Sequence, residues 1–295
     1  MDQQSSHLRA YLALLLGILC LGFSAIFVRA ANAPGVVSSL HRMVIAGLIF
    51  TVPFIRQARN GARPPRRGVL LALLAGLFFG ADLFFWSEGI MIGGATNPTV
   101  MANTAPAWVG LGALVIFRER LNARFWLGLA IALAGVAVVL GVSSLQEISL
   151  GVGTLYGLLA GMFYGGFFLV AQRGRALLRS IPFFWFSVLG STALLLVLGL
   201  ARGVAYTGYP LESYLYFLAA GLISQVGGWF AINYAQGHLP ATVVSPTMLG
   251  QPVITAIAAV ALLGEDLGVW QVVGGAAILG GVYLVHRARS NSEEK

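Results

Sequence analysis

Apolar runs of about 20 residues recur ten times along this chain, and they constrain its fold more than any other feature. A helix needs roughly 20 apolar residues to cross the hydrocarbon core of a bilayer. Only 9% of the residues are charged, whereas a soluble domain carries about 25% and needs them to cover its water-facing surface. The sequence therefore predicts an all-α integral membrane protein with ten transmembrane helices.

Short breaks that carry turn residues or charge, such as Arg63-Pro-Pro65, separate the runs. Consecutive helices must then be antiparallel, and no long linker or soluble domain lies between them. The expected spans are residues 10–31, 35–55, 68–92, 95–117, 124–142, 150–172, 181–200, 213–236, 241–263 and 268–285.

The positions of the basic residues predict the orientation. With a cytoplasmic N-terminus, fifteen of the 18 Lys and Arg residues fall in cytoplasmic segments, Arg29 and Arg202 fall outside, and Arg42 lies within a span. Cytoplasmic loops of membrane proteins carry such an excess of positive charge. We therefore expect a multi-pass protein of the plasma (inner) membrane of a prokaryote, with both termini cytoplasmic.

The second half of the sequence repeats the first at a spacing of 146 residues, most clearly where Pro106 matches Pro252 and Glu119 matches Glu265. The other aligned pairs include Thr96 with Thr242, Leu121 with Leu267, Gly128 with Gly274 and Gly135 with Gly281. Each half holds five spans, an odd number, so the second half enters the membrane upside down. Inverted repeats are a recurrent architecture of secondary transporters, which bind substrate near the midplane between the halves. The expected repeats are residues 10–143 and 148–287.

The stretch 94–135 resembles the EamA-type repeat of the drug/metabolite transporter superfamily. The resemblance rests on Pro106, Glu119-Arg-Leu121, Gly128 and Gly135, on the second copy of these residues, and on Arg42, which matches a frequent arginine of that repeat. It covers almost the whole chain. The resemblance implies a ten-helix carrier for small metabolites, often an exporter, that is energised by gradients or runs as an exchanger.

Among the ionisable side chains within the expected spans, four candidates stand out: His41, Arg42, Asp82 and Glu88. A charge at the bilayer centre costs about 2.5–3.5 kcal/mol and usually marks a substrate or ion path. At about 1.5 Å per residue, Arg42 lies roughly 10 Å, Asp82 roughly 15 Å and Glu88 roughly 6 Å from the outer ends of their helices. We expect Glu88 to be solvated at the outer mouth and His41 to be satisfied at the interface.

Arg42 and Asp82 are therefore predicted to line a central cavity, where Arg42 holds a substrate carboxylate or pairs with Asp82. Asp82 is the candidate carrier of a coupling proton, because burial favours a neutral carboxyl group. The structural alternative is a permanent Arg42–Asp82 ion pair that fixes two helices against each other.

Uncharged polar and aromatic residues at similar depths complete the candidate substrate site. They are Trp86, Asn103, Trp108, Tyr164, Gln225 and Gln251. Pro106 and Pro252 lie near the middle of their spans, where each removes a backbone donor and frees an upstream carbonyl. Such groups must be satisfied locally or line a cavity, so both prolines are candidate hinges. A tolerated kink, or plain packing for the aromatic residues, is the alternative.

The sequence contains no enzyme signature, no ATP-binding loop and no Cys/His cluster with metal spacing, and its single Cys20 excludes a disulfide framework. We expect no enzyme activity, no metal, no cofactor and no nucleic-acid partner. The favoured interpretation is a secondary carrier in the lipid bilayer that exports small polar molecules such as amino acids by alternating access, with protons as the candidate coupling ion. A broad-specificity drug exporter and a non-transporting membrane scaffold or intramembrane enzyme are the alternatives.

Overall fold

The computed structural model describes residues 3–61, 63–93, 96–141, 151–263 and 268–293, and regular structure in these ranges is entirely helical. Nine segments among them are long and apolar enough to cross a membrane, and the shorter Ala123–Val139 supplies a tenth. The predicted fold class, ten transmembrane helices in two inverted sets of five, is confirmed. The Glu265-Asp266 loop and the expected junction of the repeats, residues 143–148, lie outside the described residues.

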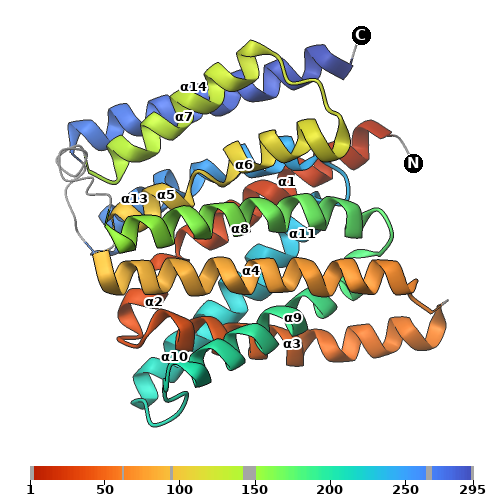
Figure 1. Ribbon diagram of the computed structural model, residues 1–295, viewed down its shortest axis with the longest axis vertical. Helices are drawn as coiled ribbons and strands as arrows, with labels where there is room; N and C mark the ends of the chain where they lie inside the picture. The colour runs from red at the N-terminus through yellow and green to blue at the C-terminus, as the bar shows by residue number, and fades with distance from the viewer. Residues whose placement is uncertain (1–2, 62, 94–95, 142–150, 264–267, 294–295) are drawn as a thin grey trace.

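The helices form one bundle in which the two chain ends lie on the same side (Figure 1). We call this side the terminal face and the opposite side the far face. The first half contains α1 Gln3–Gly22, α2 Ser24–Ala30, α3 Gly35–Asn60, α4 Arg66–Gly93, α5 Thr96–Ala102, α6 Ala105–Gly112, the π-helical η1 Ala113–Phe117 and α7 Ala123–Val139. The second contains α8 Val152–Arg175, α9 Ser180–Ala201, α10 Leu211–Ala219, the π-helical η3 Ala220–Trp229, α11 Phe230–Ala235, α12 Ala241–Thr247, the 3₁₀ turn η4 Met248–Gly250, α13 Gln251–Leu263 and α14 Val269–Glu293.

Several helices run further than the apolar runs predict, and α3 and α14 do so at their C-terminal ends. α3 continues past Ile55 to Asn60, and α14 continues past Val285 to Glu293. Both extensions lie at the terminal face and carry charged residues, which favour water over lipid without breaking the helical hydrogen bonds. The apolar run thus marks the membrane-embedded part of each helix and underestimates its length.

The fourth and ninth spans are discontinuous helices. Asn103 and Thr104 separate α5 from α6, and Thr104 Oγ1 donates to the Met101 carbonyl at 2.6 Å while Asn103 Nδ2 donates to the Thr99 carbonyl at 2.8 Å. These bonds satisfy carbonyls near the break, as a membrane interior requires. Pro106 and Pro252 each lie in the first turn after a break, where a missing amide donor costs little. Both candidate hinges therefore occupy breaks in the helix rather than kinks in a continuous one.

Glycine pairs bring α7 of the first half against α14 of the second. A Cβ built on Gly128 would lie 2.7 Å from the Gly281 carbonyl oxygen, and one on Gly135 would lie 2.6 Å from that of Gly274. The spacing of 146 residues aligns Gly128 with Gly274 and Gly135 with Gly281, so the two contacts exchange under the repeat. This reciprocity is what a twofold axis between inverted halves produces, and only glycine allows the helices to approach so closely.

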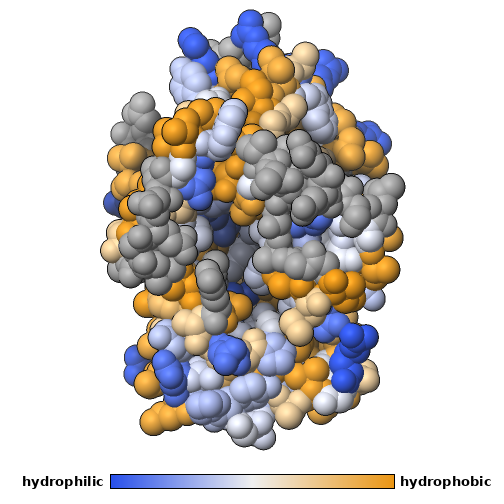
Figure 2. All heavy atoms as spheres, turned by 90° about the vertical axis from the view of Figure 1, so that its left-hand side faces the viewer, coloured by the Kyte–Doolittle hydropathy of each residue, from blue (hydrophilic) through white to orange (hydrophobic). Residues whose placement is uncertain are grey.

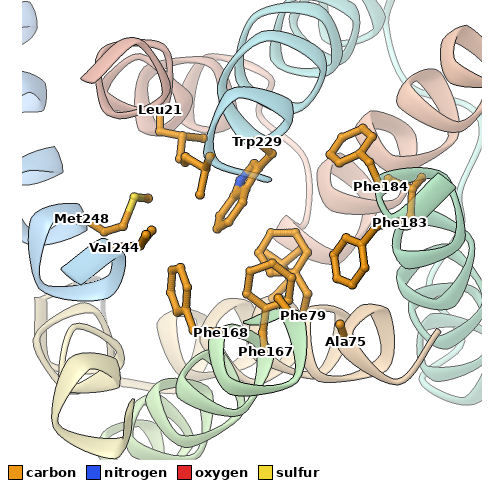
Figure 3. Close-up of a cluster of buried hydrophobic side chains, with 14 of the residues drawn as sticks. Leu21, Ala75, Phe79, Phe167, Phe168, Phe183, Phe184, Trp229, Val244 and Met248 are labelled. Atoms are coloured by element: carbon orange, nitrogen blue, oxygen red, sulfur yellow. The ribbon is translucent and has the colours of Figure 1, made fainter. Parts of the chain in front are cut away.

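A buried aromatic core fills the middle of the bundle (Figure 3). Phe79 of α4, Phe167 and Phe168 of α8, and Trp229 of η3 are at most 7% exposed, and Val244 and Met248 pack beside them. Phe79 and Trp229 meet edge to face with ring centroids 4.4 Å apart. Dense packing of this kind excludes water from the space between these aromatic side chains.

Candidate functional site

A cavity of about 380 Å³ lies between the two halves and opens toward the far face. Its rim includes Val139 and Leu140 at the end of α7 and Gln271 in the first turn of α14. The face opposite the chain ends is hollowed near its middle (Figure 2). The floor is formed by Phe79 and Trp229, which belong to the aromatic core. The structure is therefore open on the far face and closed toward the terminal face.

Arg42 on α3 lines this cavity although its side chain is only 5% exposed. Its Nη1 donates to the Ser24 hydroxyl of α2 at 3.2 Å, and its Nε is buried without a hydrogen-bond partner. A guanidinium has five N–H donors in a planar fork that matches a carboxylate. Arg42 thus retains donors for a bound anion.

Asp82 on α4 lines the same cavity and is 7% exposed. Within the described part of the chain, the ion pairs shorter than 4 Å join Arg202 to Glu88 and Arg289 to Glu119, and none joins Arg42 to Asp82. The two side chains face the same cavity, but they do not form a contact ion pair. Both side chains are therefore available to a molecule in the cavity.

Polar and aromatic side chains form the remaining walls. Trp86 Nε1 donates to Thr99 Oγ1 at 3.1 Å, which holds the indole against the broken fourth span. Asn103 stands at that break, and Tyr164 and Gln251 come from the second half. The structure thus brings together six of the proposed substrate-binding residues, Arg42, Asp82, Trp86, Asn103, Tyr164 and Gln251, and Pro252 lies beside them.

Two other candidate residues lie elsewhere. Gln225 is 1% exposed and borders a separate void of about 10 Å³ beneath Trp229, together with Asn233. Trp108 is absent from the cavity lining, and its Cβ lies close to Gly165 of α8. Pro106, the other candidate hinge, also lies away from the cavity, so these three residues have no direct access to its contents.

The two other ionisable residues of the spans have local partners. Glu88 pairs with Arg202 at 2.5 Å near the far face. His41 Nδ1 is 2.9 Å from the Val37 carbonyl, and its ring stacks on Phe217. Neither residue lines the cavity.

Sequence reasoning missed several lining residues, including Ser24, Ser39, Thr99 and Gln271. Ser39 lies three residues before Arg42 and Thr99 lies four before Asn103, so helical periodicity would have placed each beside a known candidate. Ser24 and Gln271 join the site from other helices, and no local pattern identifies them.

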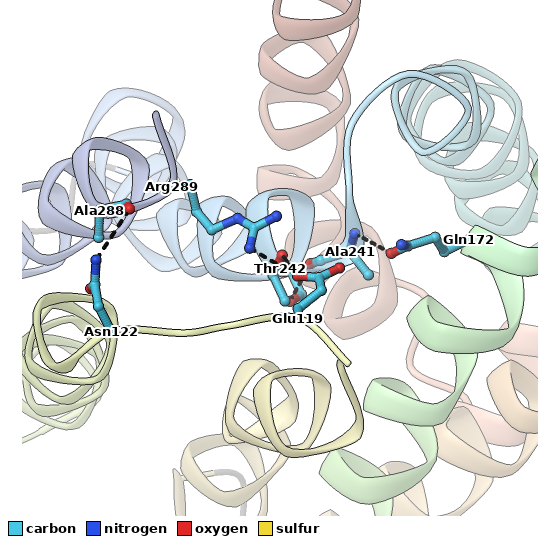
Figure 4. Close-up of polar contacts among 8 residues, drawn as sticks. Glu119, Asn122, Gln172, Ala241, Thr242, Ala288 and Arg289 are labelled. Carbon is cyan, nitrogen blue, oxygen red and sulfur yellow. Dashed lines mark hydrogen bonds and ion pairs between the residues drawn. The ribbon is translucent and has the colours of Figure 1, made fainter. Parts of the chain in front are cut away.

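Polar contacts between the halves tie the terminal face together (Figure 4). Glu119, just after the fourth span, accepts a hydrogen bond from Thr242 Oγ1 at 2.9 Å and pairs with Arg289 Nη1 at 3.0 Å. Asn122 Nδ2 donates to the Ala288 carbonyl at 3.4 Å. Within the second half, the Ala241 amide donates to Gln172 Oε1 at 2.6 Å. We call Glu119, Thr242 and Arg289 the latch, because they join the two halves on the closed side.

Comparison with known proteins points to a membrane transporter in each case where a function is named. The family model of the EamA-like transporter family matches residues 8–141 and 151–287. The uncharacterized transporter YdfC of Bacillus subtilis (strain 168) is 24% identical over 217 residues, which are 74% of this chain and 70% of that protein. An uncharacterized transporter of Archaeoglobus fulgidus is 23% identical over 278 residues, 93% of this chain and 95% of its own. A crystal structure with 17% identity matches with a TM-score of 0.78 over 98% of this chain and 100% of that one, and supports the fold.

Proposed function

Because the chain belongs to the EamA-like transporter family, we propose that it is a secondary carrier for small polar metabolites, in particular amino acids or related compounds. That it is a membrane transporter rather than an enzyme follows from the family and from the relatives named above. The observation that carries the finer proposal is the cavity between the halves, which holds Arg42 and Asp82 without a contact between them.

An amino acid has the complementary chemistry. Two buried charges within a membrane protein are costly unless each finds a partner. A zwitterion brings a carboxylate for Arg42 and an ammonium for Asp82, and it carries no net charge across the bilayer. Trp86, Tyr164 and Trp229 supply the aromatic wall against which its side chain would pack.

Alternating access gives the cavity its role. In the proposed cycle, the two halves exchange conformations, so that the open far face closes while the latched terminal face opens. Pro106 and Pro252 are the proposed hinges, because each follows a break in a span. With the termini in the cytoplasm of a prokaryote, the structure corresponds to the outward-open state, and the proposed direction is export through the plasma membrane.

A broad-specificity drug exporter is the second candidate, and the aromatic wall of the cavity favours it. Such an exporter would bind bulky apolar cations and depend little on Arg42. A scaffold without transport activity is disfavoured, because it needs a dry, closed centre rather than a polar cavity of about 380 Å³.

The test is uptake into proteoliposomes, with and without a pH gradient, of a panel of amino acids and of lipophilic cations. We expect uptake of at least one amino acid class, and a strong loss of it in Arg42→Ala and in Asp82→Asn. Uptake of the lipophilic cations alone would favour the drug exporter. Unchanged amino acid transport in both variants would refute the assignment of the site.

A further inference from the structure

A second and larger hollow, of about 1070 Å³, opens at the terminal face, away from the central cavity. The end of α3, the linker that follows it, the turn between α8 and α9, and α11 enclose it. We call it the arginine groove, because Arg56, Arg63 and Arg179 stand around it. The carrier function proposed above does not use it.

The arginine groove carries unbalanced positive charge. Arg56, Arg63 and Arg179 are exposed, and no described residue forms an ion pair or a side-chain hydrogen bond with them. No described residue that lines the groove is acidic. Three cations gathered at one concave surface without a counter-charge repel one another, and they favour an anionic ligand.

A fourth arginine in the groove is already occupied and has a structural role. Arg175 is buried, and its Nε donates to the Asn233 carbonyl at 2.9 Å while its Nη2 donates to Ser180 Oγ at 2.8 Å. It also donates to the Leu178 carbonyl. These bonds tie the α8–α9 turn to α11, so the back wall of the groove is fixed.

The aromatic residues at its edge indicate the depth of the groove in the membrane. Trp185 stacks on Phe54 with ring centroids 4.2 Å apart, and its Nε1 donates to Thr51 Oγ1 at 3.0 Å. Tryptophan is enriched at the level of the lipid headgroups. Arg56 follows Phe54 by two residues and lies nearer the water. Phe54, Ile181 and Phe230 form an apolar wall of the groove.

We propose that the arginine groove binds an anionic phospholipid from the leaflet on the terminal side. Its phosphate would lie among Arg56, Arg63 and Arg179, and an acyl chain would lie along Phe54 and Ile181. Basic pockets between transmembrane helices bind lipid headgroups in this way. Gln57 Oε1, which is buried in the lining without a hydrogen-bond partner, can accept a bond from a headgroup hydroxyl. The apolar wall favours a lipid over a free anion.

Native mass spectrometry of the purified full-length protein tests the proposal, with phosphatidylglycerol and phosphatidylcholine of identical acyl chains as probes. We expect phosphatidylglycerol to bind at least about tenfold more tightly, since each arginine near an anionic headgroup contributes roughly fivefold. The variant with Arg56→Gln, Arg63→Gln and Arg179→Gln should lose this preference. The matched control, Arg59→Gln with Arg66→Gln and Arg67→Gln, removes the same charge from the same face outside the groove and should retain it.

Substitution of Arg56, Arg63 and Arg179 by lysine keeps the charge of the groove. This variant should retain most of the preference for phosphatidylglycerol, and it tests the proposal even if the glutamine variant does not fold. Equal binding of the two lipids, or an equal loss in the Arg59, Arg66 and Arg67 control, would overturn the proposal. So would displacement of phosphatidylglycerol by millimolar inorganic phosphate, which would identify a site for free anions.

Discussion

The side chains of Arg42 and Asp82 share one cavity without forming a contact ion pair, and the proposed substrate site rests on this arrangement. A closed pair would satisfy both charges and leave neither group available to a ligand. Here Arg42 donates to Ser24 through one nitrogen, and its Nε has no partner. At the scale of single residues, the structure therefore favours a site for a charged ligand over a permanent link between α3 and α4.

The affinity of Arg42 for a substrate carboxylate should depend on the shape of the guanidinium and not only on its charge. Arg42→Lys keeps the charge but loses the planar fork. We expect Arg42→Gln to weaken binding of an amino acid substrate about 10- to 100-fold, the range for a hydrogen bond to a charged group, with Arg42→Lys in between. Isothermal titration measures this, with the amide of the same amino acid as control. If the amide loses as much affinity as the acid, Arg42 does not hold the carboxylate.

Asp82 is the proposed carrier of a coupling proton. Exchange of labelled for unlabelled substrate needs substrate binding but no proton gradient, so it separates this role from substrate binding. Asp82→Asn cannot take up or release a proton. Because Asp82 is also the proposed partner of the substrate ammonium, we expect this variant to lose both accumulation driven by a pH gradient and exchange of labelled for unlabelled substrate across proteoliposomes. Glu88→Gln, which neutralises an acid outside the cavity, should leave both activities unchanged. Loss of accumulation with exchange retained in Asp82→Asn would instead indicate that Asp82 carries the coupling proton and does not hold the substrate.

At the scale of helices, the contact between α7 and α14 depends on glycine. A Cβ on Gly281 would lie 2.5 Å from the Gly128 carbonyl oxygen, whereas one on its neighbour Gly280 would meet nothing within 4 Å. We expect Gly281→Ala to destabilise the protein by about 1–3 kcal/mol through overpacking, and Gly280→Ala to be neutral or slightly stabilising. Thermal unfolding in detergent compares the two variants, and equal midpoints would show that the helices can separate at no cost.

The sequence predicts the spans well but not their internal breaks. Hydropathy registers the length of an apolar run, and Thr96–Ala102 with Ala105–Gly112 reads as one run. Pro106 is the residue that signals an interruption in this run. It lies in the first turn of α6, where a proline does not kink the helix because no backbone donor is needed. Pro252, in the first turn of α13, signals the 3₁₀ turn Met248–Gly250 in the same way.

The same limit explains which site residues could be predicted. Arg42 and Asp82 stand out because a charge in an apolar run has few explanations other than function. Gln225 and Gln251 are equally polar, yet only Gln251 lines the cavity. Gln225 lies in the π-helical segment Ala220–Trp229, where the rotation per residue differs from that of an α-helix. Which face a residue occupies there depends on tertiary packing and not on sequence spacing.

At the scale of the whole molecule, the latch and the cavity lie on opposite faces, and each conformation of a carrier must open only one of them. Glu119 comes from the first half, and Thr242 and Arg289 come from the second. In the proposed cycle, opening of the terminal face would break these bonds. The latch would then stabilise the state seen here against the proposed state that is open on the terminal face.

Glu119→Gln should shift this balance. The substitution removes the ion pair to Arg289, and a hydrogen bond to a charged group is worth enough to change the ratio of two states by about tenfold. Ala256 lines the open cavity, so Ala256→Cys in a Cys20→Ala background reports the open far face through its reaction with a membrane-impermeant thiol reagent. We expect Glu119→Gln to slow this labelling several-fold, because the far face closes when the terminal face opens.

Glu88→Gln provides the matched control, since it breaks the ion pair to Arg202 outside the latch. It should not slow the labelling, because no contact of the closed face is lost. If Glu119→Gln leaves the labelling rate unchanged while the terminal face becomes accessible, both faces are open at once and the two halves do not move as a coupled pair. The protein would then conduct like a channel, and the proposal of alternating access would be refuted.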